Sequence, residues 1–140
     1  MNHIQSPATG DQAIESAIVS AGANVAPRVT PADIEAAIVS EHYFTAEQGV
    51  FGARVDPIVR SGGAVTLADV PATEGKTLEL LTFCVLVLRN GFTVTGESAC
   101  ASPENFNSEI GRRIARENAV SKVWPLLGFL LKEKLNGQST

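Results

Sequence analysis

Two runs rich in β-forming residues flank an Asn-Gly pair in the second half of the chain, and this pattern predicts an antiparallel β-hairpin. Asn90 and Gly91 are the residue types that supply the two positive φ angles of a type I′ turn. With these two residues as the turn, Leu88 faces Thr93. Both faces of the first strand are apolar, so we expect a central strand that helices or a second subunit cover on both sides. Its alternating positions are Leu80, Cys84, Leu86 and Leu88 on one face and Leu81, Phe83, Val85 and Val87 on the other.

Apolar residues at steps of four after the hairpin predict the main helix of the chain. Ser102 is an N-cap residue and Pro103 suits the first helical position, so the helix should begin there. Pro125 removes an amide donor and should end or kink the helix, which makes 126–135 a second helical piece. That piece is almost continuously apolar and is therefore either deeply buried or part of an oligomer interface. The stripe expected to face the core consists of Phe106, Ile110, Ile114, Val120 and Trp124.

The N-terminal part of the chain contains a near repeat, which predicts paired short helices or is a chance similarity. The second copy has the better helix signals. Thr30 is an N-cap residue, Pro31 suits the first helical position, and Asp33 complements the helix dipole. Ile34 then begins the side of this helix that we expect to be buried.

Glycine and proline interrupt every periodic pattern between residues 48 and 76, so we expect a Gly-rich loop insert, with 64–70 as a candidate short strand. Together the patterns predict an α+β fold. In it the antiparallel β-hairpin belongs to a small sheet packed with N-terminal helices and a C-terminal helix pair. Residues 1–29 are expected to form an N-terminal helical arm, and 30–140 a single domain that carries the insert. Because so apolar a hairpin is poorly protected alone, we also expect a homo-oligomer.

Composition narrows the class of protein. The chain has 140 residues, 44% of them hydrophobic and 19% charged, with a net charge of -4, as is typical of one compact domain. The acidic total disfavours general affinity for nucleic acid or anionic membranes, and the longest apolar run, 83–88, is too short to span a bilayer. The N-terminus lacks the pattern of a signal peptide. We therefore expect the host cytoplasm, where Cys84 and Cys100 stay reduced.

The sequence offers little for catalysis. It contains no nucleophile elbow, no Walker-type phosphate loop, and no Ser/His/Asp or Cys/His set with a supporting context. His42 is more typical of a packing or capping residue than of a general base. Two cysteines and two histidines without CxxC or HxxxH spacing do not form a metal site. We therefore expect no enzyme activity, no cofactor and no metal.

Three arginines on the main helix are the best candidates for a binding site. Arg112 and Arg116 are four residues apart on one side of the helix, roughly opposite the apolar stripe, and Arg113 lies beside them. Guanidinium groups in a row suit bidentate contacts with phosphate. The alternative is a solvated helix face on which Glu109 and Glu117 pair with these arginines, and the spacing alone favours that alternative.

The second strand of the hairpin adds hydroxyl groups to this candidate site. Thr93 and Thr95 share one face of the strand and could hydrogen-bond a ligand, although threonine is also an ordinary strand residue. Gly96 in the middle of the strand predicts a bulge or a close approach by another backbone or a ligand.

Two segments of the chain resemble a tailed-phage protein family that is labelled only by gene-product numbers, forty-nine in one phage and sixty-six in another. The first segment, residues 26–44, reads APRVTPADIEAAIVSEHYF, and the second, residues 80–131, contains the hairpin and the capped helix. The resemblance implies a phage or prophage protein and gives the fold in outline. It implies no activity, because that family is functionally uncharacterised.

A looser resemblance is to phage sponge proteins that sequester nucleotide immune signals, the Thoeris and CBASS inhibitors. In the Thoeris group a strand aromatic stacks on the base, while Asn and helix Arg residues hold phosphate or ribose. The same order of residues occurs in this chain. The resemblance therefore implies these roles for Phe83 in the strand, Asn90 at the turn, and Arg112 and Arg116 on the helix.

Three functions remain open from the sequence. The first is a phage or prophage accessory protein without catalytic activity that binds a small phosphorylated ligand, with sequestration of a cyclic nucleotide immune signal as the specific form. The alternative is an interaction module that binds a host or phage protein through the C-terminal leucine-rich segment. A nucleic-acid-binding accessory protein is the weakest of the three, because the total charge is acidic and exposed aromatic residues are sparse.

Overall fold

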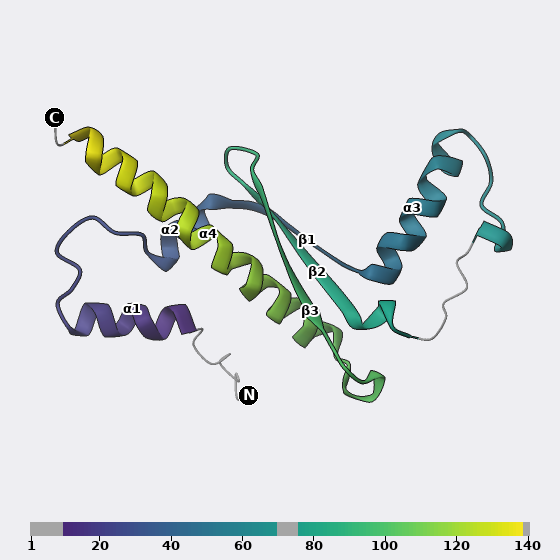
Figure 1. The fold of residues 1–140 in the computed structure, drawn as a ribbon, viewed down its shortest axis with the longest axis horizontal. Helices are drawn as coiled ribbons and strands as arrows, with labels where there is room; N and C mark the ends of the chain where they lie inside the picture. The colour runs from purple at the N-terminus through teal and green to yellow at the C-terminus, as the bar shows by residue number, and fades with distance from the viewer. Residues whose placement is uncertain (1–9, 70–75, 139–140) are drawn as a thin grey trace, which may run out of the picture. The chain divides into compact units, whose positions relative to one another are not determined.

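The computed structural model describes residues 10–69 and 76–138, and its helices and strands form an α+β fold, as predicted (Figure 1). These residues group into two compact units. One is Ile38–Lys122, and the other combines the residues up to Ala37 with those from Val123 onward. The elements are α1 (Gly10–Ser20), α2 (Pro31–Ala37), β1 (Ile38–Thr45), α3 (Ala46–Arg60), β2 (Leu81–Leu88), β3 (Thr93–Ala99) and α4 (Ser108–Gln138), with 3-10 turns at Leu67–Asp69, Leu78–Leu80 and Pro103–Asn105.

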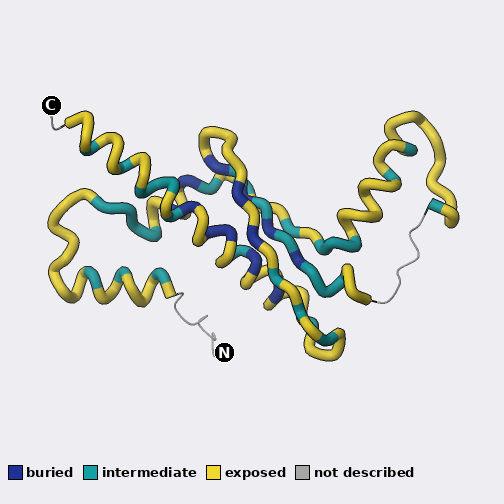
Figure 2. Tube along the Cα trace, viewed as in Figure 1, coloured by how far each residue is buried: buried dark blue, intermediate teal, exposed yellow. Residues whose placement is uncertain are grey.

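The unit Ile38–Lys122 is built on an antiparallel sheet with the strand order β1-β2-β3. The apolar strand β2 is central, as predicted, but only one of its faces is buried within the described chain. The expected covering of the other face stays a prediction. The burial of β2 alternates strictly, because successive side chains of a strand point to opposite faces. Leu86 has no exposed surface, whereas its neighbours Val85 and Val87 stay partly exposed. Figure 2 shows buried residues concentrated along β2 and along the adjoining part of α4.

The hairpin turn is not the predicted type I′ turn. Gly91 N donates to Leu88 O at 2.8 Å, and Leu88 N donates to Phe92 O at 2.8 Å, so the loop has three residues. Only its last residue, Gly91, has a positive φ, at 86°. Asn90 keeps an ordinary φ because its Oδ1 accepts the Phe92 N–H at 3.0 Å. Thr93 therefore pairs with Val87 instead of Leu88.

This shift of one residue changes the face on which the hairpin threonines lie. Thr93 and Thr95 pair with Val87 and Val85, so they share the face of β2 that also carries Phe83. The opposite face carries Val94 and Gly96 from β3, and both are buried.

The residues of α4 that lie closest to the sheet are small, and the predicted stripe is wrong at Ile110 and Ile114, although Val120 is buried as predicted. Ala115 and Ala119 have no exposed surface and Gly111 is buried, whereas Ile110 and Ile114 are 56% and 42% exposed. A Cβ atom built on Gly96 would overlap the backbone oxygen of Ala115 and the backbone nitrogen of Ala119. So close an approach of helix and strand leaves no room for isoleucine between them. The close approach predicted at Gly96 is confirmed, and the approaching backbone is that of α4.

The predicted C-terminal helix pair is a single helix. The chain after Ser102 first forms the 3-10 turn Pro103–Asn105, and α4 begins only at Ser108. The Oδ1 of Asn107 caps the helix by accepting the Ile110 N–H at 3.1 Å. The helix then continues through Pro125. A proline removes one hydrogen bond, and the leucine-rich turns after it have high helix propensity, so one missing bond does not end the helix.

A helix of 15 residues, α3, begins just before the predicted loop insert and covers its first part. A capping box starts it: Gln48 N donates to Thr45 Oγ1 at 3.2 Å, and Thr45 N donates to Gln48 Oε1 at 2.9 Å. This Thr-x-x-Gln spacing was the sequence signal that the glycine and proline residues obscured. The candidate strand at 64–70 is also wrong for its described part, because Leu67–Asp69 is a 3-10 turn and Val70 lies outside the described residues.

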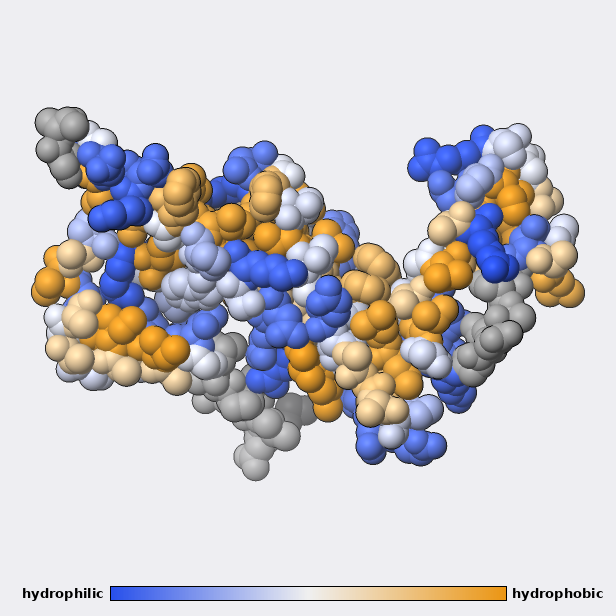
Figure 3. Space-filling model, viewed as in Figure 1, coloured by the Kyte–Doolittle hydropathy of each residue, from blue (hydrophilic) through white to orange (hydrophobic). Residues whose placement is uncertain are grey.

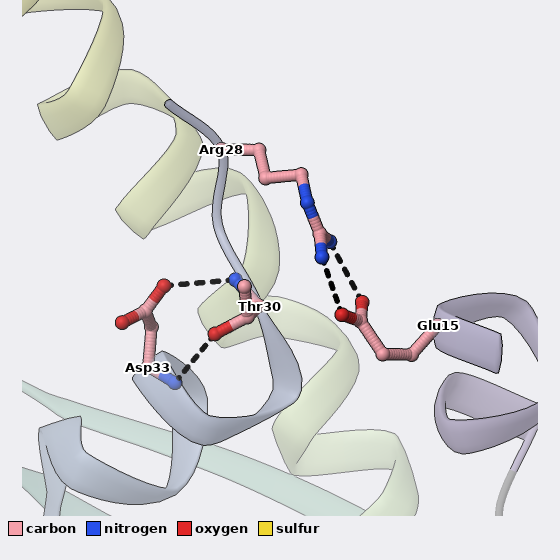
Figure 4. Close-up of polar contacts among 4 residues, drawn as sticks. All are labelled: Glu15, Arg28, Thr30 and Asp33. Carbon is pink, nitrogen blue, oxygen red and sulfur yellow. Dashed lines mark hydrogen bonds and ion pairs between the residues drawn. The ribbon is translucent and has the colours of Figure 1, made fainter. Parts of the chain in front are cut away.

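The N-terminal cap of α2 follows the prediction (Figure 4). Asp33 N donates to Thr30 Oγ1 at 3.2 Å, and Thr30 N donates to Asp33 Oδ2 at 2.9 Å, which is a reciprocal capping box. Ile34 is 2% exposed, as expected for the buried side of the helix. The predicted division of the chain at residue 29 stays a prediction.

Candidate interaction surfaces

The predicted ligand-binding residues are divided between the two faces of the sheet. Phe83, Thr93 and Thr95 lie on the face away from α4, which we call the open face. Arg112, Arg113 and Arg116 are on α4, which packs on the opposite face, and Asn90 is in the hairpin loop at one end of the sheet. A ligand that stacks on Phe83 therefore cannot also contact the arginines in one chain.

Ion pairs involve two of the three arginines. Arg116 Nε donates to Glu41 Oε2 of β1 at 2.7 Å, and Arg113 Nε lies 3.7 Å from Glu117 Oε1 on the next turn of α4. Arg116 therefore lies beside the sheet and is half-buried, whereas Arg112 and Arg113 are exposed. The arginines were expected roughly opposite a buried stripe. The expectation depended on Ile110 and Ile114 facing the sheet. These pairs agree with the alternative of a solvated helix face.

The open face has an apolar centre and a polar rim. Its central row comes from β2 and remains partly exposed. Ser40 and His42 of β1 flank the row on one side, joined by a hydrogen bond of 3.1 Å, and Thr93, Thr95 and Glu97 of β3 flank it on the other. The central row consists of Leu81, Phe83, Val85 and Val87.

A stacked aromatic pair closes one end of the open face. The rings of Phe44 and Phe83 have their centroids 5.5 Å apart at an interplanar angle of 26°. Helix α3 touches this pair, because Gly49 lies against the Phe44 ring. Sequence reasoning did not group Phe44 with Phe83, because that pairing depends on the register between β1 and β2.

Helix α3 extends the apolar surface. None of its described residues is buried, and Val50, Phe51 and Val59 expose 37%, 40% and 56% of their surface. These three residues are spread around the helix, since Val50 and Val59 are nine positions apart and lie on opposite sides. Figure 3 shows apolar side chains on the surface of α3, with polar ones between them. A helix that buries so little apolar surface is weakly held by packing, and exposed apolar residues of this kind are typical of a protein contact.

The leucine-rich end of α4 is a second exposed apolar segment, in the other unit. Phe129 and Leu130 are 66% and 57% exposed, so the segment is not deeply buried within the described chain. An interface between chains was the other explanation that its sequence left open, and that explanation stays a prediction.

The free edge of β3 is partly blocked. The hydrogen bonds Leu88 N to Phe92 O and Cys100 N to Leu80 O show that even-numbered residues of β3 direct their backbone groups toward β2. Odd-numbered residues therefore direct theirs outward. Asn118 of α4 uses its Nδ2 to donate to the outward carbonyl of Glu97 at 2.8 Å. An added strand would compete with this bond, so side-chain contacts on the open face are the better route for a partner.

The half-buried Tyr43 of β1 pairs with the buried Cys84 of β2 on the face under α4. Burial is the main cause that raises the pKa of Tyr43 to about 12, and the neighbouring Cys84 and Glu41 add to it. Burial likewise raises the pKa of the Cys84 thiol. Both groups are therefore uncharged near neutral pH, and a protonated thiol is a poor nucleophile. Among the described residues, no group of three or more His, Cys, Asp or Glu gathers in a way that could hold a metal ion.

Two carboxyl groups meet where α3 begins, and they make stability depend on pH. A hydrogen bond to Glu79 raises the pKa of Glu47, and burial and the charge of Glu79 act in the same direction. The folded chain therefore holds this proton more tightly than the unfolded chain. Its stability falls as the pH rises from the ordinary pKa of Glu47 through the raised one.

Glu79→Gln should remove this loss. We expect the variant to melt a few degrees above the wild type at pH 7, with the difference shrinking toward pH 4 as the Glu47 carboxyl takes up its proton in both proteins. Differential scanning calorimetry across this pH range checks it. Glu104→Gln, an exposed change elsewhere in the same unit, is the matched control. An equal difference at pH 4 and pH 7 would show that the carboxyl pair is not its cause.

The comparisons with known proteins give a family. The family model described as the Phage protein (N4 Gp49/phage Sf6 gene 66) family matches residues 29–135. The match runs from just before α2 to near the end of α4 and includes the segment 48–76. No curated protein and no solved structure matches the chain. Among the described residues, no helix is long and apolar enough to cross a membrane.

Proposed function

This chain belongs to the N4 Gp49/phage Sf6 gene 66 family of phage proteins, and from that premise we propose that it is an accessory protein that acts by binding another protein, without catalysis. The open face of the sheet, together with the adjoining start of α3, where Gly49 lies against Phe44, is the proposed docking surface. The partner is a protein of the host or of the phage.

One observation carries this proposal: the two faces of the sheet differ in how they are covered. The face under α4 is closed by small residues and is fully buried at Leu86 and Cys84. The open face keeps an apolar centre, an aromatic pair and a polar rim, which is the arrangement found in protein interfaces. Phe44 and Phe83 are the natural anchors, because aromatic residues carry much of the energy of such contacts.

A small phosphorylated ligand is less well supported by the geometry. Small ligands prefer concave sites with convergent polar groups, and a strand face is open and flat. Arg112 and Arg113 are exposed neighbours on α4, but Phe83 and the two threonines lie beyond the sheet from them. The hypothesis of a nucleotide sponge stays a prediction. The test is the melting temperature with cyclic di- or trinucleotides. If these raise it for the wild type, and the double substitution Arg112→Ala and Arg113→Ala abolishes the rise, nucleotide binding would be favoured over protein binding.

Site-specific photo-crosslinking in the host cell tests the proposed docking surface. The photoreactive residue p-benzoylphenylalanine replaces His42 on the rim of the open face, and in a control protein it replaces Lys122, which is exposed on α4. We expect a discrete adduct with one other protein from position 42 and none of the same mass from position 122.

A second variant ties the adduct to the apolar row. Val85→Thr combined with Val87→Thr keeps the shape and the β-propensity of both side chains but removes apolar surface. The adduct from position 42 should then weaken at least severalfold, while circular dichroism shows an unchanged fold. Identical adducts from positions 42 and 122 would overturn the proposed surface. An adduct containing two copies of this chain would assign the surface to self-association instead.

A further inference from the structure

The unit that contains α1 has a pocket of about 200 Å³, separate from the open face. Its lining comes from two successive turns of α1, from the segment before α2, and from one residue of α4. The size suits a single long side chain rather than a nucleotide, because sites for drug-sized ligands begin at about 300 Å³. The lining residues are Asp11, Ile14, Glu15, Ile18, Val29 and Trp124.

The indole of Trp124 is held in place by a carboxylate of the same pocket. Trp124 Nε1 donates to Asp11 Oδ2 at 3.1 Å, across 113 positions of sequence. A hydrogen bond from an uncharged indole fixes the carboxylate but does not neutralise it. Asp11 therefore keeps its negative charge next to an aromatic ring, and both groups attract a cation.

The second carboxylate of the pocket is already paired. Arg28 Nη1 donates to Glu15 Oε2 at 2.7 Å, and Arg28 Nη2 donates to Glu15 Oε1 at 2.5 Å (Figure 4). This bidentate pair uses both oxygens of Glu15 and balances its charge. It also lowers the pKa of Glu15, which keeps that carboxyl ionised and the pair intact. Within residues 10–69 and 76–138, Asp11 is the pocket carboxylate that has no cationic side chain paired with it, so its charge is the one that a ligand can meet.

We propose that this pocket binds the side chain of an arginine or lysine from a partner protein. The alkyl stem packs against Ile14, Ile18 and Val29, while the charged end lies against Trp124 and Asp11. An anion would be repelled by Asp11. A neutral apolar group would desolvate the Asp11 carboxylate without forming a hydrogen bond or ion pair with it. It therefore binds less well than a cation of the same length.

The chain has one tryptophan, so its fluorescence reports directly on this pocket. Purified full-length protein is titrated with n-butylguanidinium, n-butylammonium, 1-pentanol and pentanoate, while emission excited at 295 nm is followed. We expect a saturable change with the two cations, with dissociation constants of about 1 mM for such small probes. Pentanol should bind more weakly and pentanoate should give no saturable change. Equal binding of pentanol and the cations, or no saturation with any probe, would overturn the proposal.

Asp11→Asn is the matched variant, because the amide oxygen still accepts the Trp124 N–H while the charge is removed. Cation binding should weaken about tenfold, and binding of pentanol should not change. Raising the salt concentration should weaken cation binding to the wild type in the same way, which tests the charge without any substitution. Unchanged cation affinity in both experiments would show that Asp11 does not select the ligand.

Titration with putrescine distinguishes a pocket for a free polyamine from a pocket for a protein side chain. Putrescine carries a charge at each end, whereas an arginine or lysine side chain carries one charge on an apolar stem. Tighter binding of putrescine than of n-butylammonium would overturn the assignment to a side chain. The variant with Val85→Thr and Val87→Thr should give an unchanged titration, so a failure of the pocket and a failure of the open face are told apart.

Discussion

Gly96→Ala is expected to destabilise the protein by about 3 kcal/mol or more, a large part of the stability of a small domain. The added methyl group would overlap the backbone oxygen of Ala115 and the backbone nitrogen of Ala119. Backbone atoms inside a helix cannot rotate away as a side chain can. The whole helix must therefore move off β3, and the contacts that bury Cys84 and Leu86 weaken with it.

Urea denaturation followed by circular dichroism measures this loss. Gly52→Ala in α3 is the matched control, because a Cβ atom at Gly52 meets no other atom within 4 Å. That substitution should leave the free energy of unfolding unchanged or raise it by up to about 1 kcal/mol, since alanine has the higher helix propensity. A loss of less than about 1 kcal/mol for Gly96→Ala would mean that α4 is not packed so closely on the sheet.

The orientation of α4 shows where the periodic pattern of the sequence misleads. Ile110 and Ile114 recur at the spacing of a buried stripe, and so do Gly111, Ala115 and Ala119 one position later. Size alone favours the isoleucines as the buried set. The deciding contact is Gly96, which admits a helix only through small residues. That constraint comes from a residue on another element, so it cannot be read from the sequence of α4 alone.

The local signals were more reliable where a single turn of chain decides the structure. The cap of α2 at Thr30 and the apolar central strand β2 follow from residues a few positions apart. The candidate site depends instead on the register and on which face α4 covers. A three-residue loop in place of a two-residue turn moved Thr93 to the face of Phe83, and the packing of α4 put the arginines beyond the sheet from both.

Leu86→Ala should cost about 3 kcal/mol, whereas Val87→Ala, on the next residue of the same strand, should cost about 1 kcal/mol or less. Leu86 has no exposed surface and faces α4, so its removal leaves a cavity. Val87 is partly exposed on the open face, where water or neighbouring side chains can fill the space. Replacement by alanine loses more β-propensity at valine than at leucine, so a larger loss at Leu86 reflects the covering of the two faces and not propensity.

Chemical denaturation at two protein concentrations tests this pair of variants and, with it, the basis of the proposed function. If the open face is free in the isolated protein, the loss for Val87→Ala stays small and does not depend on concentration. If a second copy of the chain covers it, the loss approaches that of Leu86→Ala, and the melting temperature of the wild type rises with protein concentration. The open face would then be an assembly interface, and a foreign partner would have to bind elsewhere. The exposed Phe129 and Leu130 on the leucine-rich end of α4 would be the next surface to substitute.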